Sequence, residues 1–330
     1  MKKILTVIIP TYNVEKYLDQ CLKSMVIDDY MELLEILVIN DGSVDSSPEI
    51  ARKYVEVFPD TFKLINKENG GHGSTINVGI QMAKGKYLKV IDSDDWVDES
   101  AFKRLIDFLL KTDSDLVYSN YYWVDSNTGK KRIEFPEPFI NVEYNKEYNF
   151  SVIPEGCFLK MHGYTLKTEI AKQIPPIDEN CFYVDMEFVV FPVLYIETVT
   201  FLNEFVYMYR VGNTGQSMSS SKLMRNAENY DIVFKRLLAF YQNFEFPYYK
   251  KAYIESVMAR MVATRIKIFL CFPYDRKIEN KISKFDLTIK KKFPDIYGKV
   301  KNRAVKILRL THYKMYIFAR FAYYCKERFV

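Results

Sequence analysis

Three aspartates within four positions form the stretch with the clearest chemical potential. Asp92, Asp94 and Asp95 follow the mostly apolar residues 87–91, which are typical of a buried strand. Carboxylates this close repel one another and raise each other's pKa unless a cation or hydrogen-bond donors lie among them. Mg²⁺ and Mn²⁺ prefer oxygen ligands, and take one or two protein carboxylates together with phosphate oxygens and water. The alternative is a solvated turn before a helix that begins near residue 98.

Apolar runs alternate with amphipathic stretches along the first 120 residues. The pattern predicts strands at residues 4–9, 35–39, 62–65 and 86–91, and helices at residues 14–26, 46–57, 74–84 and 98–111. Strands that alternate with helices in this way form a mostly parallel sheet with right-handed crossovers. We therefore predict an α/β fold. A further strand at residues 115–119 precedes a hairpin turn at residues 125–129.

Polar residues follow each of the first four predicted strands. They are Thr11-Tyr12-Asn13 after the first strand, Asn40-Asp41-Gly42-Ser43 after the second, the glycine-rich residues 66–73 after the third, and the aspartates after the fourth. In a parallel sheet these loops meet at the carboxyl edge, where ligands bind. Tyr12 can stack on a base and Asp41 can accept a hydrogen bond from a ring N–H, so a nucleoside diphosphate held by a metal fits this edge. No dinucleotide-binding or P-loop glycine motif occurs.

Together these motifs resemble family 2 glycosyltransferases of the GT-A fold, over residues 4 to about 220. The matching segments are Val7–Asn13 (VIIPTYN), Val38–Ser43 (VINDGS), Asn69–Gly71 with Asn77–Ile80, and Ile91–Asp95 (IDSDD). The resemblance implies an inverting, metal-dependent enzyme that moves a sugar from a UDP-sugar to an acceptor hydroxyl. The sequence has no Q-x-x-R-W motif and no apolar run of membrane-spanning length, which favours the bacterial non-processive type.

The resemblance also implies roles for individual residues. The residues that would hold the uridine are Pro10, Tyr12 and Asp41. Asp92 would contact the ribose or the sugar, and Asp94 would bind the Mn²⁺ or Mg²⁺ that bridges the diphosphate. Asp95 would either share the metal or position the sugar. Further donor-binding candidates from the same motifs are Asn13, Gly70, Gly71 and Asn77.

The general base of the family is expected about ninety residues beyond the aspartates, in the segment YVDMEF at 183–188. Asp185 is the expected base. Glu187 is the fallback, because the glutamate that usually precedes the base is replaced here by Val184. Asp185 can also serve as a helix N-cap, which is compatible with catalysis. Arg210 lies in a segment that resembles the donor-covering part of related enzymes, and either pairs with phosphate or forms a surface ion pair.

Charge is distributed unevenly. Residues 281–330 hold 14 Lys and Arg and three acidic residues, a net charge of +11, whereas the whole chain carries only +5. Helical apolar spacing begins near residue 222, which predicts a catalytic domain at 1–220 and a helical region at 221–330. Basic and aromatic residues interleave in 301–328 as in one amphipathic helix. We expect it to contact an anionic membrane surface, the catalytic domain or a second subunit of a homo-oligomer. No nucleic-acid-binding module occurs, so no nucleic-acid partner is expected.

Length and composition limit the classes of protein to which this chain can belong. With 330 residues, 48% hydrophobic and 27% charged, the chain suits a soluble protein with one large α/β domain and a smaller part. Five cysteines without a C-x-x-C pair indicate a reducing compartment. The apolar run after Met1 is too short for a signal peptide and ends at Pro10. We expect a cytoplasmic location, peripheral on the inner face of the cell membrane where the tail binds lipid. His72 and His162 are isolated in sequence, and we interpret both as structural.

The expected acceptor is a cell-surface glycan, lipid-linked or polymeric. Two alternatives remain open. A nucleotidyltransferase of similar fold would need a glycine-rich basic loop after the first strand, where this chain has Pro10–Asn13. A nucleotide-sugar-binding regulatory or scaffold subunit would bind donor without turnover, which the presence of Asp94 and Asp185 disfavours.

Overall fold

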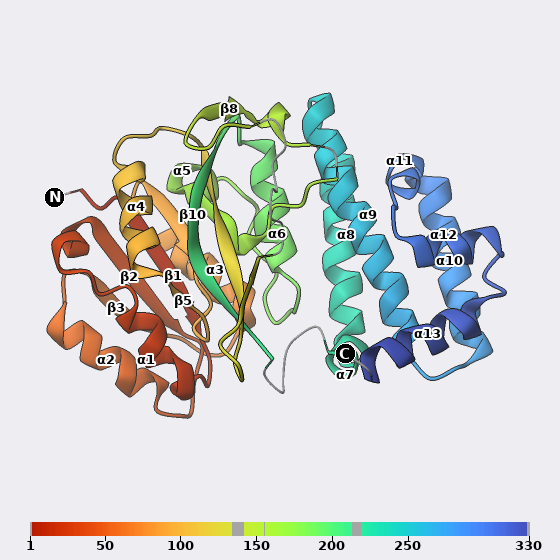
Figure 1. The fold of residues 1–330 in the computed structure, drawn as a ribbon, viewed down its shortest axis with the longest axis horizontal. Helices are drawn as coiled ribbons and strands as arrows, with labels where there is room; N and C mark the ends of the chain where they lie inside the picture. Colours follow the sequence, from red (N-terminus) through yellow and green to blue (C-terminus); the bar gives the residue numbers. More distant parts are fainter. Residues whose placement is uncertain (1, 134–141, 155, 213–218, 329–330) are drawn as a thin grey trace. The chain divides into compact units, whose positions relative to one another are not determined.

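A computed structural model describes residues 2–133, 142–154, 156–212 and 219–328. Two compact units make up the chain: residues 1–152 with 159–213, and residues 153–158 with 214–330 (Figure 1). Residues 153–158 therefore pack with the C-terminal part, although the sequence analysis placed them in the first domain. The predicted boundary at residue 220 stays a prediction.

The N-terminal unit is built on one twisted sheet. Its strands are β1 (Leu5–Thr11), β2 (Leu34–Asn40), β3 (Phe62–Asn66), β4 (Tyr87–Val90), β5 (Trp96–Val97), β6 (Leu116–Asp125), β7 (Lys131–Ile133), β8 (Glu147–Asn149), β9 (Tyr164–Lys167) and β10 (Thr198–Val211). The main order is β3-β2-β1-β4-β9-β6-β10-β5, with β7 paired to β6 and β8 to β10. The first four strands are fully parallel, as their apolar runs predict.

Beyond these four strands the sheet also contains antiparallel pairs. Strand β9 lies between β4 and β6 and is antiparallel to both. Strands β6 and β10 are parallel to each other, while β6 and β7 form the hairpin that residues 125–129 predict. Strand β10 extends past the sheet centre to pair with β5, the short strand that follows the aspartates. This pairing brings residue 210 next to the acidic loop.

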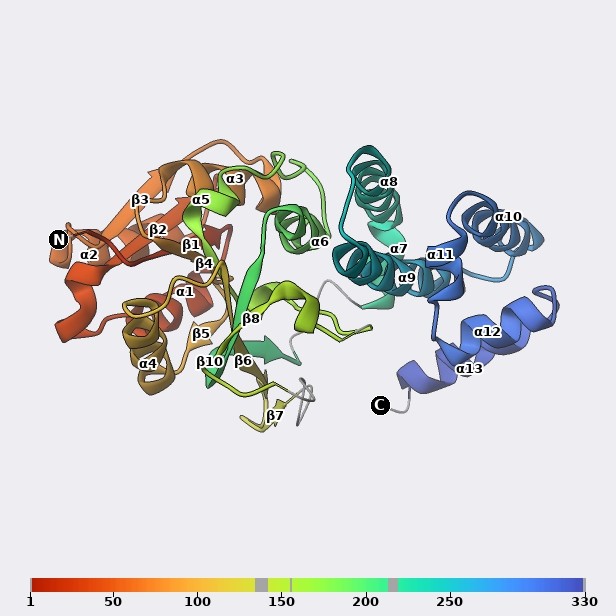
Figure 2. The same ribbon diagram turned by 90° about the horizontal axis from the view of Figure 1, so that it is seen from above.

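Helices cover both faces of the sheet (Figure 2). Those of the N-terminal unit are α1 (Glu15–Lys23), α2 (Ser47–Val57), α3 (Gly71–Met82), α4 (Glu99–Leu109), α5 (Thr168–Ala171) and α6 (Asp185–Val190). Leu22 of α1 and Leu105 of α4 share one buried core with Val7 of β1. On the other face Gly79 of α3 lies directly against Ile8, where a Cβ would come within 2.5 Å of that side chain. Helices fixed this closely hold the loops at the carboxyl edge in place.

The C-terminal unit is helical. Its helices are α7 (Ser220–Arg225), α8 (Ala227–Asn243), α9 (Tyr248–Cys271), α10 (Arg276–Lys292), α11 (Pro294–Gly298), α12 (Arg303–Leu310) and α13 (Tyr316–Arg328). Helix α9 is the core of this unit and is buried on most sides. Among the helices that the structure describes, none combines the length and apolar character needed to cross a bilayer.

The predicted single helix at residues 301–328 is wrong in one respect. It is two helices, α12 and α13, separated by a turn in which His312 and Tyr313 have positive φ angles of 48° and 64°. A left-handed backbone at two successive residues cannot continue an α-helix. Apolar periodicity does not reveal such a break, because Leu308 before the turn and Tyr316 after it are both buried.

Candidate functional site

The loop after β2 is anchored to the start of α3. The carboxylate of Asp41 accepts hydrogen bonds from the N–H groups of Gly70 at 2.9 Å and Gly71 at 2.8 Å. Lys67 Nζ lies 2.7 Å from Asp41 Oδ1. An anion at a helix N-terminus with free N–H groups is a stable arrangement. Gly70 and Gly71 therefore present their amides to Asp41, and their predicted contact with the donor stays a prediction.

Three predicted donor-binding residues line the end of β1. Tyr12 has half of its surface exposed, so its ring is available to stack on a base. Asn13 takes a left-handed backbone, and its side-chain oxygen accepts the N–H of Val44 in the next loop. Pro10 is buried within the strand. Tyr12 and Asn13 are therefore the exposed members of this group.

Asn77 has a structural task in this arrangement. Its amide nitrogen donates to Ile177 O at 2.9 Å and its oxygen accepts the Ile177 N–H at 2.8 Å. Both ends of the side chain thus hold the segment at residue 177 against α3. Asn77 therefore positions this segment, and its predicted contact with the donor stays a prediction.

The acidic loop is tied to β10. Asp95 is 1% exposed, and its two oxygens accept from Tyr207 Oη at 2.6 Å and from the Arg210 N–H at 2.7 Å. Burial, together with the charges of Asp94 and Asp92, raises the pKa of Asp95 well above its ordinary value. A buried carboxylate with both oxygens engaged fixes its neighbours. A role for Asp95 in sharing the metal or positioning the sugar stays a prediction.

Arg210 is fixed beside the acidic loop. Its guanidinium lies between the rings of Tyr17 and Trp96, 4.7 and 4.6 Å from their centroids. Its Nε donates to Asp94 O and its Nη2 to Gln20 Oε1, both at 2.7 Å. The cation is therefore positioned next to the main chain of Asp94, where an anionic ligand would meet it.

Asp92 is held by a histidine that the sequence analysis interpreted as structural. His72 Nε2 lies 3.0 Å from Asp92 Oδ1. Burial favours the neutral forms of both groups, but the hydrogen bond and charge between them prevail, so the pKa of His72 is raised and that of Asp92 is lowered. The charges of Asp185 and Asp94 also act on His72. The signal in the sequence was its place in the first turn of α3, directly after the glycines.

Asp185 and Glu187 occupy opposite environments. Asp185 begins α6 and its side chain is exposed, although the surrounding protein still desolvates the carboxylate and raises its pKa. The charge of His72 acts in the opposite direction, and that of Asp92 raises the pKa further. Glu187 is completely buried and accepts the Asp178 N–H at 2.8 Å. Only Asp185 is open to an acceptor.

The carboxylates of the acidic loop suit a metal ion that a bound ligand also coordinates. Within the described part of the chain, no three His, Cys, Asp or Glu side chains are arranged to bind a metal by themselves. Asp94 is half-buried, and burial and the charge of Asp92 raise the pKa of its carboxyl group. A divalent cation would relieve this repulsion, and phosphate oxygens would complete its coordination. The residues present therefore fit a metal that arrives with a diphosphate.

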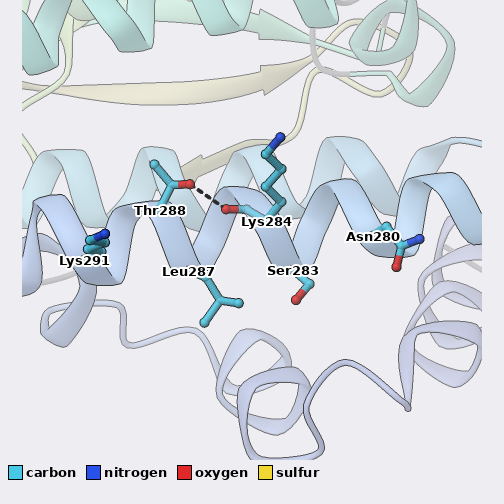
Figure 3. Close-up of a pocket in the computed structure, with 6 residues that line it drawn as sticks. All are labelled: Asn280, Ser283, Lys284, Leu287, Thr288 and Lys291. Atoms are coloured by element: carbon cyan, nitrogen blue, oxygen red, sulfur yellow. Dashed lines mark hydrogen bonds between the residues drawn. The ribbon is translucent and has the colours of Figure 1, made fainter.

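A separate hollow of about 420 Å³ lies on α10 in the C-terminal unit. Figure 3 shows its six lining residues along that helix, with the Thr288 hydroxyl donating to Lys284 O at 2.7 Å. It contains none of the residues predicted for the site. The carboxyl edge of the sheet remains the place where the candidate residues meet.

Comparison with known proteins agrees with this geometry. The model of the family described as Glycosyl transferase family 2 matches residues 6–173. The chain belongs to glycosyl transferase family 2. It is 28% identical over 218 residues to the glycosyltransferase GlyA of Streptococcus pneumoniae, covering 63% of this chain and 30% of that protein. It is 28% identical over 235 residues to the minor teichoic acid biosynthesis protein GgaB of Bacillus subtilis, covering 69% of this chain and 25% of that protein. The chain thus spans less than a third of these two relatives.

Solved structures show the fold of this family 2 chain. Residues 1–349 of S. aureus TarS in complex with UDP align with a TM-score of 0.67 at 18% identity, over 98% of this chain and 91% of that one. The mannosyltransferase PcManGT of Pyrobaculum calidifontis, in complex with GDP-Man and Mn²⁺, aligns with a TM-score of 0.55 at 15% identity, over 98% and 87%. The GT-A fold predicted from the sequence is confirmed.

The contact between His72 and Asp92 gives a first prediction. His72→Phe should lower kcat/KM by about tenfold, because Asp92 loses the donor that orients it. His72→Gln keeps a donor and should retain more activity. Since the His72 charge lowers the pKa of Asp185, both variants should move the acidic limb of the pH–rate profile to higher pH. A profile that stays in place in both variants would show that His72 only packs.

Proposed function

We propose that this chain is an inverting, metal-dependent glycosyltransferase that uses a UDP-sugar. The observation that carries the proposal is that three carboxylates lie near His72. The charges of Asp92, Asp94 and Asp185 all act on its imidazole. The acids predicted for the donor and the metal therefore lie near the predicted base. A donor at the carboxyl edge and an acceptor near α6 would meet in that region.

Asp185 is the base in this proposal. Its exposed carboxylate accepts the proton of an acceptor hydroxyl as the oxygen attacks the anomeric carbon from the side opposite the leaving diphosphate. One displacement inverts that carbon. A carboxyl group with a raised pKa is a stronger base than an ordinary aspartate, which favours proton removal near neutral pH. The complete burial of Glu187 favours Asp185 over it as the base.

Asp94 and Arg210 face the diphosphate in this proposal. Asp94 would hold the metal, and Mn²⁺ or Mg²⁺ bound there supplies positive charge to the departing nucleoside diphosphate. Arg210 adds a fixed cation beside the same loop, since its guanidinium is clamped between two rings. A preorganised charge of this kind stabilises a leaving anion without costly rearrangement.

The choice of uridine is supported by two observations. Oδ2 of Asp41 accepts the Gly71 N–H, and its second lone pair can accept a ring N–H of a base. Tyr12 is exposed and directly follows β1, the strand that pairs with β2, after which Asp41 lies. The TarS structures are complexes with UDP and with UDP-GlcNAc, which favours the same class of donor here.

The acceptor is proposed from the relatives. GgaB is described as a minor teichoic acid biosynthesis protein, which favours a cell-surface polymer or its lipid-linked precursor as the acceptor. A UDP-sugar donor is consistent with a cytoplasmic location for the reaction. These assignments extend the proposal and do not alter the roles of the residues at the site.

Calorimetric titration of a panel of UDP- and GDP-sugars, with Mn²⁺ and with chelator, tests the proposal. We expect one UDP-sugar to bind at least about tenfold more tightly than its GDP counterpart, and chelator to weaken binding by about tenfold or more. The bound donor is then incubated with acceptor extracts and UDP release is followed. Metal-dependent binding without release of UDP would favour the regulatory or scaffold subunit. Release of diphosphate from a nucleoside triphosphate and a sugar phosphate would favour the nucleotidyltransferase.

A further inference from the structure

We propose that the exposed sides of α12 and α13 form a docking surface for an anionic lipid membrane. The proposal concerns the C-terminal unit alone, so it goes beyond the transfer reaction and does not depend on it. It rests on exposed apolar side chains, on the sign of the charges around them and on the way the same two helices are fixed to the core.

Large apolar side chains are exposed on both helices. Leu310 of α12 is 81% exposed, and Phe318 and Phe321 of α13 are each 66% exposed. Ile307 and Ile317 are each about half exposed. Soluble monomers rarely gather this many bulky apolar groups on neighbouring exposed segments unless the surface binds something. Phe and Leu are also the side chains that enter the interfacial layer of a bilayer.

The charges along α12 and the first part of α13 have one sign. From residue 299 to residue 323 the sequence contains Lys and Arg but no Asp or Glu. Arg303, Lys306 and Lys314 are exposed among the apolar side chains. Helix α10 ends in Lys290, Lys291 and Lys292, which are exposed in the same unit. Exposed cations beside exposed aromatic rings match the headgroups and acyl chains of an anionic leaflet.

The opposite sides of the helices are fixed to the unit. Arg309 forms two hydrogen bonds of 2.8 Å with the buried carboxylate of Asp286 on α10, and Tyr313 donates to the same carboxylate. Leu308 and Tyr316 are buried. These residues explain why only part of the predicted basic and aromatic stripe is available. The exposed set is therefore a surface presented by a folded unit.

The charge decides between a membrane and a second copy of this chain. In a symmetric dimer the same patch meets itself, so cation would face cation across the interface. Like charges placed opposite each other oppose association. An anionic bilayer attracts the same cations and accepts the apolar side chains. We therefore assign the surface to a membrane, and a dimer becomes an outcome that the test can detect.

Vesicle flotation of the full chain tests the proposal. The probes are phosphatidylcholine vesicles, and the same vesicles with about 30% phosphatidylglycerol. The wild-type chain should bind the anionic vesicles at least about tenfold more tightly, and high salt should weaken this binding. Leu310→Ser/Phe318→Ser/Phe321→Ser should lose about tenfold or more of it. Equal binding to both vesicle types, or no loss in the triple variant, would overturn the proposal.

Matched variants separate the surface from general changes in the protein. Val57→Ser/Leu110→Ser/Tyr248→Ser removes three exposed apolar side chains elsewhere and should bind as the wild type does. Lys306→Glu/Lys314→Glu should weaken anionic binding, whereas Lys53→Glu/Lys111→Glu should have a smaller effect. These charge variants keep the proposal falsifiable where the triple variant fails to fold. A wild-type dimer in sedimentation that the triple variant abolishes would overturn the membrane assignment.

Discussion

Asp185→Asn is expected to lower kcat by about 10²- to 10⁴-fold while donor binding changes little. Asparagine has nearly the same size but cannot accept a proton from the acceptor hydroxyl. Because Asp185 begins α6 and is exposed, the substitution leaves the core intact. Donor affinity is measured by calorimetry and turnover by UDP release. Weaker donor binding with unchanged kcat would contradict the assignment.

The pH dependence supplies a second readout for the same residue. Desolvation raises the pKa of Asp185, so its ionised, basic form is lost as the pH falls through a value above that of an ordinary aspartate. The acidic limb of the wild-type kcat/KM profile should therefore lie above the usual aspartate range. Glu187→Gln is the matched control, since the amide oxygen can still accept the Asp178 N–H. The Glu187→Gln variant should keep the wild-type kcat and the wild-type position of the acidic limb of the kcat/KM profile.

Asp94→Ala should abolish the metal dependence of donor binding and lower the transfer rate by about 10³-fold. The reason is that Asp94 is half-buried, whereas Asp92 contacts His72 and both oxygens of Asp95 are engaged by Tyr207 and Arg210. Titration of the donor with Mn²⁺ and with chelator measures the first effect. A UDP-release assay measures the second.

Asp98→Ala is the control for Asp94→Ala. Asp98 lies four residues further on and caps α4 by accepting the Ala101 N–H at 3.0 Å. Its loss should cost about 1 kcal/mol of stability through the cap, yet leave metal-dependent donor binding in place. If Asp94→Ala still binds its donor better with Mn²⁺ than with chelator, the metal does not belong to Asp94.

Much of this protein could be predicted from local sequence. Apolar runs alternating with amphipathic helices predict β1 to β4 and the helices between them, because strands covered on both faces need continuous apolar residues. In a parallel sheet the carboxyl ends of the strands lie at one edge, so the loops with Tyr12, Asp41 and Asp94 are expected together there. Asp185 was also predicted from sequence as the base, through its resemblance to the family motif, although Val184 replaces the usual glutamate.

Tertiary structure decided the roles that depend on distant partners. Only the pairing of β10 with β5 brings Tyr207 and Arg210 to Asp95, so the sequence could not show that this carboxylate is occupied. In the same way His72 appears isolated in the chain, yet it lies 3.0 Å from Asp92. Asp185 and Glu187 both lie on α6, but Asp185 is exposed whereas Glu187 is buried. Local patterns determine elements, whereas the protonation and accessibility of a side chain are set by neighbours that only the folded chain supplies.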